Sequence, residues 1–412
     1  MFFAFLLLVS CNNESDLDLY NSSELVSYET DSITQRYTVQ QLLENATTDW
    51  RDEENFLYDI NLLVQTLEEN FPFIGVAERI TGVENPIDTL QNRLFHNSQY
   101  TSNHEFANLI ENAFRNIFFN LAHLDMNPPY QFRTMNASLV HNEPIPFEPK
   151  IIEEGKIALL PIPPQFFNRT SADPFSMREV QNFIAQIQGY EHVILDLRRI
   201  GGGNFDSSIA AFIAPNISEP LIFQEFTFIT NGEIARNTYE RQLEIAQSNR
   251  TSNTMIVRQL VDSPLVPAVD FVEQHNLTNM NQDDLQNLAY GFLLETTITN
   301  TDGVVRLPLQ AENIWLLIGS NNFSAATIFS QIAKEAGFTL VGQQANNRNS
   351  WGRASFRLPR TNNLVVMDTF YITDNTGRNT EEFPIEPHYF NRPGMDALQT
   401  TLAIIAERSE NE

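Results

Sequence analysis

The sequence has little cysteine, little lysine and no long apolar run. Cys11 is its only cysteine, so the chain cannot form an internal disulfide and its folded part must rely on a core. Only three of the 25 basic residues are lysines, at positions 150, 156 and 334, so most of the chain lacks one common catalytic base. No segment approaches the roughly 18 apolar residues of a membrane helix, and no membrane span is predicted.

The charge of the chain is strongly one-sided. Acidic residues outnumber basic residues by 52 to 25, which gives a net charge of −27. Such a surface repels phosphate backbones, so no nucleic-acid partner is expected. Hydrophobic residues make up 42% of the chain and aromatic residues 11%, which excludes a disordered protein. At about 100–200 residues per domain, the length predicts two or three domains.

The first residues have the pattern of a processed signal. Residues 1–11 are a short apolar run that ends in Leu8-Val9-Ser10-Cys11, which resembles the lipobox of bacterial lipoproteins, although no Lys or Arg precedes it. The resemblance implies cleavage before Cys11 and lipidation of Cys11, with a secretory peptide and an incidental cysteine as the alternative. Residues 12–36 are rich in Asn, Ser, Asp and Glu and predict a flexible linker. We therefore expect a protein of the bacterial cell envelope, held at the outer membrane by a lipid anchor only, on its periplasmic or cell-surface face.

Residues 37–145 are predicted to form a helical N-terminal domain. Apolar residues recur at three- and four-residue spacing from Asp52 to Asn70 and from about His104 to Asn120, which is the period of an amphipathic helix. Prolines crowd residues 126–155 and predict a connector.

Residues 146–412 alternate predicted strands with predicted helices. This order is typical of an α/β fold with a largely parallel sheet between helices. An Asn- and Gln-rich stretch at about 233–300 predicts a helical insertion. The expected strands are residues 156–162, 192–197, 314–318, 338–341 and 364–372, and the expected helices are residues 174–187, 324–336 and 395–407.

Two loops at predicted strand ends carry candidate chemistry. Gly201, Gly202 and Gly203 follow the strand at 192–197, and exposed N–H groups there can hold an oxyanion; a flexible turn is the alternative. Ser324 follows the strand at 314–318 and opens a helix, where free N–H groups, including that of Ala325, favour a nucleophilic serine. Serine is also a preferred helix N-cap, so both interpretations remain open.

His123 is a third candidate, because it follows the second N-terminal helix and imidazole is a general base near neutral pH. A lone histidine at a helix end is equally a capping or surface residue. The seven histidines are scattered, and neither HExxH nor paired-cysteine spacing occurs. No metal and no cofactor are therefore expected.

Taken together and in order, these segments resemble the C-terminal processing, or tail-specific, serine proteases. Residues 196–203 (DLRRIGGG) are similar to the family's DLRxNxGG turn, and Ser324-Ala325-Ala326 with Leu340-Val341-Gly342 to its nucleophile segment. Residues 156–162 resemble its first core strand and residues 384–387 (PIEP) its closing GIxPD stretch. The resemblance covers about residues 150–410 and implies a serine protease core of the crotonase/Clp-like α/β type.

The shortage of lysine indicates which branch of that family the chain resembles. The Ser–Lys branch places its lysine some 25 residues after the serine, where this chain has Arg353, which stays protonated. Lys334 is ten residues along the predicted helix, about 15 Å away. The chain therefore resembles the tricorn-core-like branch, here without a PDZ module. That resemblance assigns the base to His123, although the Asp, Gly and Thr of the DGHT turn are absent, and the orienting carboxylate to Glu382 or Glu381.

The resemblance implies hydrolysis of peptide bonds in a peptide or protein substrate. Ser324 would attack the carbonyl, and His123 would accept the serine proton and return it to the leaving amine. The N–H groups of Gly202 or Gly203 and of Ala325 would bind the oxyanion.

Two arginines and two alternative functions complete the expectations. Arg353 and Arg357 are candidates for binding a substrate carboxylate. Because several motifs are incomplete, a catalytically inactive protease-fold lipoprotein that binds peptides or another ligand remains an alternative. A structural envelope protein is a further one.

Overall fold

The computed structural model describes most of the chain after residue 52. Described are residues 53–96, 102–119, 121–127, 147–167, 174–249, 256–260, 265–300, 310–345 and 352–411. Cys11, the signal peptide predicted at 1–11 and the linker predicted at 12–36 lie outside these residues. Within the described ranges, no helix combines the length and the apolar character that crossing a membrane requires.

The N-terminal region is helical, as the periodicity predicted. Ser102 caps α6 through its Oγ, which accepts the Glu105 N–H at 3.2 Å, and Phe119 ends this helix with a positive φ of 53°. The apolar faces meet in an aromatic core in which Phe71, Phe114 and Phe118 are almost fully buried. The helices are α3 (Glu53–Asn70), α4 (Ile74–Thr81), α5 (Pro86–His96) and α6 (Asn103–Phe118).

A six-stranded sheet forms the α/β core, in the order β14-β10-β9-β4-β3-β2. All neighbouring strands are parallel except β2 and β3. The strands are β2 (Lys150–Glu153), β3 (Ile157–Pro161), β4 (His192–Asp196), β9 (Ile314–Ile318), β10 (Thr339–Gly342) and β14 (Tyr389–Phe390).

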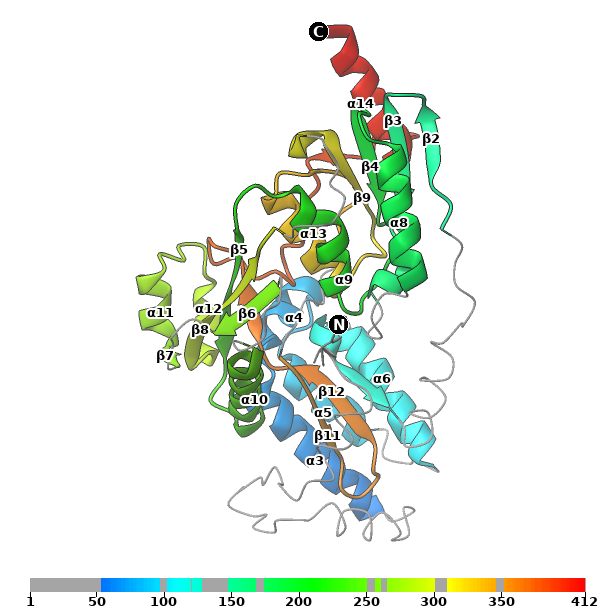
Figure 1. Cartoon of the computed structure of the whole chain (residues 1–412). Coiled ribbons are helices and arrows are strands. Elements are labelled where there is room, and N and C mark those ends of the chain that lie inside the picture. The colour runs from blue at the N-terminus through cyan, green and yellow to red at the C-terminus, as the bar shows by residue number, and fades with distance from the viewer. Residues whose placement is uncertain are drawn as a thin grey trace.

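Helices cover both faces of this sheet (Figure 1). Successive side chains of a strand point to opposite faces, so Leu316 packs with α8 (Pro174–Gln186) and α13 (Ala325–Glu335). Trp315 and Leu317 pack on the other face with α14 (Ala397–Asn411). The α/β fold predicted from the sequence is therefore the fold of the chain. Short helical turns lie at Leu121–His123, Pro164–Phe167, Asp206–Ser208 (α9), Ile209–Ile213, Ala214–Asn216 and Ala311–Asn313.

The stretch predicted as a helical insertion is partly sheet. Its last strand, β8, pairs antiparallel with β5 along nine residues, and this pairing outweighs the local preference. A second sheet results, with order β13-β5-β8-β6 and β7 paired to β8. Its strands are β5 (Leu221–Ile229), β6 (Ile256–Leu260), β7 (Val266–Pro267), β8 (Tyr290–Ile298) and β13 (Tyr371–Thr373). The helices between these strands are α10 (Glu233–Asn249), α11 (Ala268–Gln274) and α12 (Gln282–Asn287).

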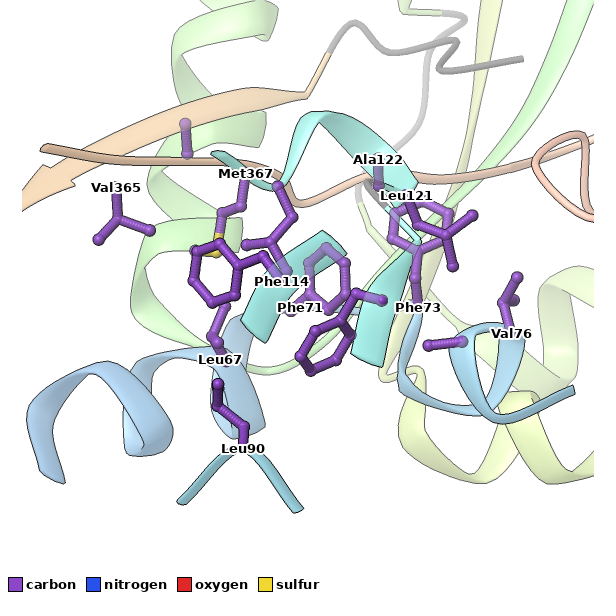
Figure 2. Packing of buried hydrophobic residues seen from close by; sticks show 14 of the residues in the cluster. Leu67, Phe71, Phe73, Val76, Leu90, Phe114, Leu121, Ala122, Val365 and Met367 are labelled. Atoms are coloured by element: carbon purple, nitrogen blue, oxygen red, sulfur yellow. The ribbon is translucent and has the colours of Figure 1, made fainter. Parts of the chain in front are cut away.

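A late hairpin returns to the helical region. Strands β1 (Asp125–Asn127), β12 (Leu364–Asp368) and β11 (Arg353–Arg357) form a third, antiparallel sheet. Val365 and Met367 of β12 pack among Leu67, Phe71 and Phe114 of the helices (Figure 2). The helical region and the β11–β12 hairpin therefore share one hydrophobic core.

Candidate active site

The two candidate loops lie side by side at one edge of the six-stranded sheet. Strands β4 and β9 are parallel neighbours, with Asp196 in register with Leu317, so their carboxyl ends meet at the same edge. The glycine turn follows β4 and the Ser324 turn follows β9. The topology thus brings together two segments that are more than a hundred residues apart in the sequence.

Asn322 joins these two loops. It is fully buried, and its Nδ2 donates to the carbonyl oxygens of Leu197 and Ile200, both at 2.7 Å. Its Oδ1 accepts the Gly319 N–H at 2.7 Å. The sequence analysis did not single out this residue, and the only local signal is an amide side chain two positions before the candidate serine.

Ser324 has an unusual backbone conformation, with φ 53° and ψ −122°. A non-glycine residue is held at such angles only by its surroundings and at a cost of about 1–3 kcal/mol. A sharp, strained strand-to-helix turn of this kind exposes the serine hydroxyl in nucleophile elbows. The side chain makes no capping hydrogen bond to α13, so Ser324 does not act as the side-chain N-cap that was the alternative.

Gly202 packs directly against this serine. A Cβ on Gly202 would lie 3.0 Å from the Ser324 Cβ and 2.9 Å from the Phe323 ring. Gly203 has φ 141°, and a Cβ there would lie 1.9 Å from the carbonyl oxygen of Phe167. Among the described residues, the N–H groups of Gly202, Gly203 and Ala325 have no hydrogen-bond acceptor. Free donors are therefore present in the glycine turn and in the Ser324 turn that lies beside it, and an oxyanion site requires such donors.

His123 lies in a different core, in the short helical turn after α6. Its Nδ1 is 2.7 Å from Oδ2 of Asp368, and both side chains are buried. A carboxylate at Nδ1 keeps the proton there in the neutral ring and leaves Nε2 as the acceptor. The preceding residue, Ala122, packs in the aromatic core beside β12 (Figure 2).

The carboxylate that contacts the His123 ring is thus Asp368, where Glu382 or Glu381 was expected. Glu382 instead forms an ion pair with Arg79, whose Nη2 is 2.7 Å from Oε2. Glu381 lies near the loop, with Oε2 3.5 Å from the Ala122 nitrogen. The sequence analysis missed Asp368, because it ends an ordinary strand and carries no motif; only the pairing of β12 with β1 brings it to His123.

The serine half and the histidine half are not joined by a hydrogen bond. Among the described residues, neither Ser324 Oγ nor His123 Nε2 has a hydrogen-bond partner. The structure brings Ser324 together with Gly202 and Ala325, and it separately brings His123 to Asp368. Catalytic hydrogen bonds are often long or open in ligand-free enzymes.

The remaining candidates are cationic. Lys334 donates to the Glu386 carbonyl at 2.9 Å. Arg353 lies opposite Asp368 in the β11–β12 register, and its buried Nε has no partner. Arg357 donates to the Asn362 carbonyl at 3.0 Å. Within the described part of the chain, no three His, Cys, Asp or Glu side chains gather as a metal site would need.

A family comparison assigns the chain. The model of peptidase family S41 matches residues 164–390, which is more than half of the chain and includes the glycine turn, Ser324 and Asp368. The chain belongs to peptidase family S41. The matched segment begins after His123, so the base candidate lies outside the part that defines this S41 chain.

Solved structures share the fold of this S41 chain at low sequence identity. A candidate peptidase from Parabacteroides merdae is 12% identical, with a TM-score of 0.52, and the match covers 87% of this chain and 97% of the other. Mature CPAF in complex with lactacystin is 13% identical, with a TM-score of 0.51 and coverage of 82% and 94%. Comparison with curated protein sequences gave no match.

Proposed function

We propose that this S41 chain is a serine-type peptidase that hydrolyses peptide bonds in polypeptides of the bacterial cell envelope. Ser324 is the nucleophile, and His123 is the general base. The N–H groups of Gly202 or Gly203 and of Ala325 bind the oxyanion. The family assignment supports a protease fold, and the local geometry supports the roles of these residues.

The Ser324 turn is the observation that carries the proposal. Its strained backbone costs stability, and its hydroxyl has no hydrogen-bond partner among the described residues. A purely structural serine at a helix start would use its oxygen to cap the helix. A free hydroxyl, in a turn that packs against a glycine turn with free N–H groups, suits attack on a carbonyl.

The reaction proceeds in two acyl-transfer steps. Ser324 Oγ attacks the peptide carbonyl carbon while His123 Nε2 accepts its proton, and the carbonyl oxygen becomes an oxyanion. Collapse of this intermediate breaks the C–N bond, and His123 gives the proton to the leaving amine. Water then hydrolyses the acyl-enzyme by the same path, with His123 again as the base, and regenerates the Ser324 hydroxyl.

Asp368 supports the base in this mechanism. Its carboxylate accepts the Nδ1 proton of His123 at 2.7 Å, which fixes the tautomer and stabilises the imidazolium that forms. Glu381 contacts the loop that carries His123, and Glu382 pairs with Arg79. Their distances to Ala122 and Arg79 favour a supporting function.

Arg353 is the better of the two candidates for a substrate carboxylate. Arg353 pairs with Asp368 in the register of β11 and β12, and its Nε has no hydrogen-bond partner among the described residues. Arg357 already donates to the Asn362 carbonyl. A guanidinium with unused donors binds a carboxylate strongly.

A serine-reactive fluorophosphonate probe tests the proposal. We expect the purified protein to be labelled on Ser324 and to cleave peptides, and Ser324→Ala to lose both properties. Ser320→Ala is the matched control, because Ser320 is an exposed serine in the same turn and its loss leaves labelling unchanged. Folded wild-type protein that is not labelled, and whose peptide cleavage is unaffected by Ser324→Ala, would overturn the proposal.

An inactive binding protein is the second candidate. The absence of a hydrogen bond between Ser324 Oγ and His123 among the described residues favours it. It predicts that peptides bind with the same Kd to the wild type and to Ser324→Ala while neither protein cleaves them.

The envelope location is proposed from the sequence at Cys11. A lipidated Cys11 would place the protein in the membrane fraction through its anchor alone. Cells fed a labelled fatty acid should incorporate it into the wild type and not into Cys11→Ala. Release of the wild-type protein as a soluble, unlabelled form would contradict the anchor.

A further inference from the structure

Arg79 on α4 lies between two carboxylates from distant parts of the chain. Its Nε is 3.0 Å from both oxygens of Glu382, and its Nη2 is 2.7 Å from Glu382 Oε2. Its Nη1 and Nη2 also donate to Asp284 Oδ1 and Oδ2, at 3.0 and 2.6 Å. One guanidinium therefore ties the helical region to α12 and to the turn at residues 379–383, which we call the Glu381–Glu382 turn.

The Asp284 side of this junction is tightly built. The Tyr371 hydroxyl donates to Asp284 Oδ2 at 2.6 Å, and the Asp284 side chain is 1% exposed. A Cβ on Gly75 would lie 2.3 Å from Asp284 Oδ1, so glycine at this position allows α4 to approach α12.

The junction keeps its charges at neutral pH. Burial acts to lower the pKa of Arg79, but the carboxylates of Asp284 and Glu382 outweigh it, and the pKa of Arg79 is raised. Burial, followed by the charge of Asp284, raises the pKa of Tyr371. Arg79 therefore stays a cation, and Tyr371 stays a hydrogen-bond donor.

Glu381 and Glu382 are neighbours in the Glu381–Glu382 turn, and the same side chain holds both backbones. Asn379 Oδ1 accepts the N–H groups of Glu381 and Glu382, at 3.0 and 3.2 Å. Asn379 Nδ2 donates to the Ile372 carbonyl at 3.2 Å. Because the two glutamates share one anchor, holding Glu382 also sets the position of Glu381.

Glu381 then meets the loop that carries His123. Its Oε2 receives the Ala122 N–H over a long 3.5 Å contact. Ala122 and His123 have positive φ values of 50° and 49°. Consecutive non-glycine residues in this region persist only where neighbouring groups hold them. Here the neighbours are Asp368 at the ring and Glu381 at the preceding amide.

We propose that Arg79 is a positioning residue for the base: its ion pairs with Asp284 and Glu382 fix the Glu381–Glu382 turn, which holds the His123 loop in its left-handed conformation. The inference rests on the proposed peptidase function. Arg79 touches neither the reacting atoms nor the His123 ring, and it acts through Glu381 and Glu382.

Arg79→Met and Arg79→Lys test this role by steady-state peptide hydrolysis. Arg79→Met removes the junction, and we expect kcat to fall about 10- to 100-fold, as a small misplacement of a catalytic group does, with KM little changed. Arg79→Lys keeps the charge but cannot bind both carboxylates with a planar, forked set of donors. Its kcat should therefore lie between those of the wild type and Arg79→Met. Arg392→Met is the matched control, because it removes an exposed ion pair with Glu407 on α14, and it should leave kcat unchanged.

A double-mutant cycle identifies the partner. If Arg79 acts through Glu382, the pair Arg79→Met with Glu382→Gln should lose no more kcat than the larger single effect. Additive losses, in which the two fold-changes multiply, would show that Arg79 does not act through Glu382 and would overturn the proposal.

The nuclear magnetic resonance signal of the His123 ring gives a readout that does not need activity. In a Ser324→Ala background, Arg79→Met should shift the Nδ1–H resonance of the His123 ring and speed exchange of the Ala122 amide, while Arg392→Met should change neither. An unchanged His123 ring resonance and unchanged Ala122 exchange in folded Arg79→Met would overturn the proposal. If the wild type neither cleaves peptides nor reacts with the probe, the proposed function fails, and this measurement still decides whether Arg79 positions His123.

Discussion

The two halves of the candidate site are built in different ways. The serine half is compact: the glycine turn and the Ser324 turn follow adjacent strands of one sheet, and Asn322 bonds one turn to the other. The histidine half is assembled from three separated segments, since His123 follows α6, Asp368 ends β12 and Glu381 lies in a late turn. Local geometry therefore builds the turn of the candidate nucleophile, whereas the surroundings of the candidate base depend on long-range packing.

Asp368→Asn should have the largest effect and tests the histidine half alone. An amide cannot hold the same tautomer of His123, and the change of a histidine-orienting carboxylate to an amide lowers kcat about 10⁴-fold in serine proteases. We expect a loss of this order with the unfolding midpoint little changed. Glu407→Gln, which neutralises an exposed carboxylate on α14, is the control. Full activity of Asp368→Asn would show that the His123–Asp368 pair is structural.

Gly203→Ala tests the serine half in the same way. The new Cβ would meet the Phe167 carbonyl oxygen at 1.9 Å, in a residue with φ 141°. Backbone strain and overpacking each cost about 1–3 kcal/mol, so we expect a loss of about 4 kcal/mol in urea unfolding. Gly189 also has a positive φ, but a Cβ there would meet nothing within 4 Å. Gly189→Ala should therefore cost only about 1 kcal/mol. Equal losses in the two variants would mean that the contact with Phe167 is unimportant.

The pH dependence of stability should distinguish the two halves, because the β11–β12 hairpin belongs only to the histidine half. Asp59 accepts the N–H groups of Arg360 and Thr361 at the tip of the β11–β12 hairpin, at 3.2 and 2.7 Å. Burial raises the pKa of Asp59 from 3.8 to about 6. The folded state therefore binds this proton more tightly. The resulting stabilisation is fully present below pH 3.8 and is lost as the pH rises through about 6.

The size of this effect is about 3 kcal/mol, at about 1.4 kcal/mol for each unit of pKa shift. Asp59→Asn should remove this contribution to the pH dependence of the free energy of unfolding. The difference in that free energy between the wild type and the variant should therefore fall as the pH rises from 4 to 7, because the contributions of the other carboxylates cancel. An unchanged slope in the variant would show that Asp59 does not titrate in this window.

Ser102→Ala should have the smallest effect. It removes the cap of α6, and loss of a serine N-cap costs about 1 kcal/mol. We expect a lower melting temperature and an unchanged kcat, because the other end of α6 leads to His123. A fall in kcat larger than the loss of folded protein would show that the whole helix, and not only the loop after it, positions the base.

Much of the fold could be predicted because its signals are local. The buried strand at 314–318 and the helix after Ser324 follow directly from apolar runs and periodicity. The 233–300 stretch was predicted as helical and is partly sheet, because β8 is stabilised by pairing with β5 and β6. Strand pairing is long-range, so the composition of one segment does not reveal it.

The residues of the candidate site likewise differ in whether a local sequence signal marks them. The glycine turn and Ser324 could be recognised because the chemistry lies within a few consecutive residues. Asp368 could not, since nothing in the segment Leu364–Asp368 distinguishes a catalytic support from any strand end. Arg79 gave no signal either, because its two partners lie 205 and 303 residues away.

The α/β alternation, the glycine turn, the candidate serine and the expectation against a Ser–Lys pair all follow from short segments and from the residue types of the chain. The contact of Asp368 with His123, and the packing of the β11–β12 hairpin against the helical region, appear only in the folded structure. Periodicity and turn chemistry act between near neighbours in the chain and can be read from it. A buried ion pair or a strand pairing joins residues whose separation in sequence carries no information, so only the fold reveals it.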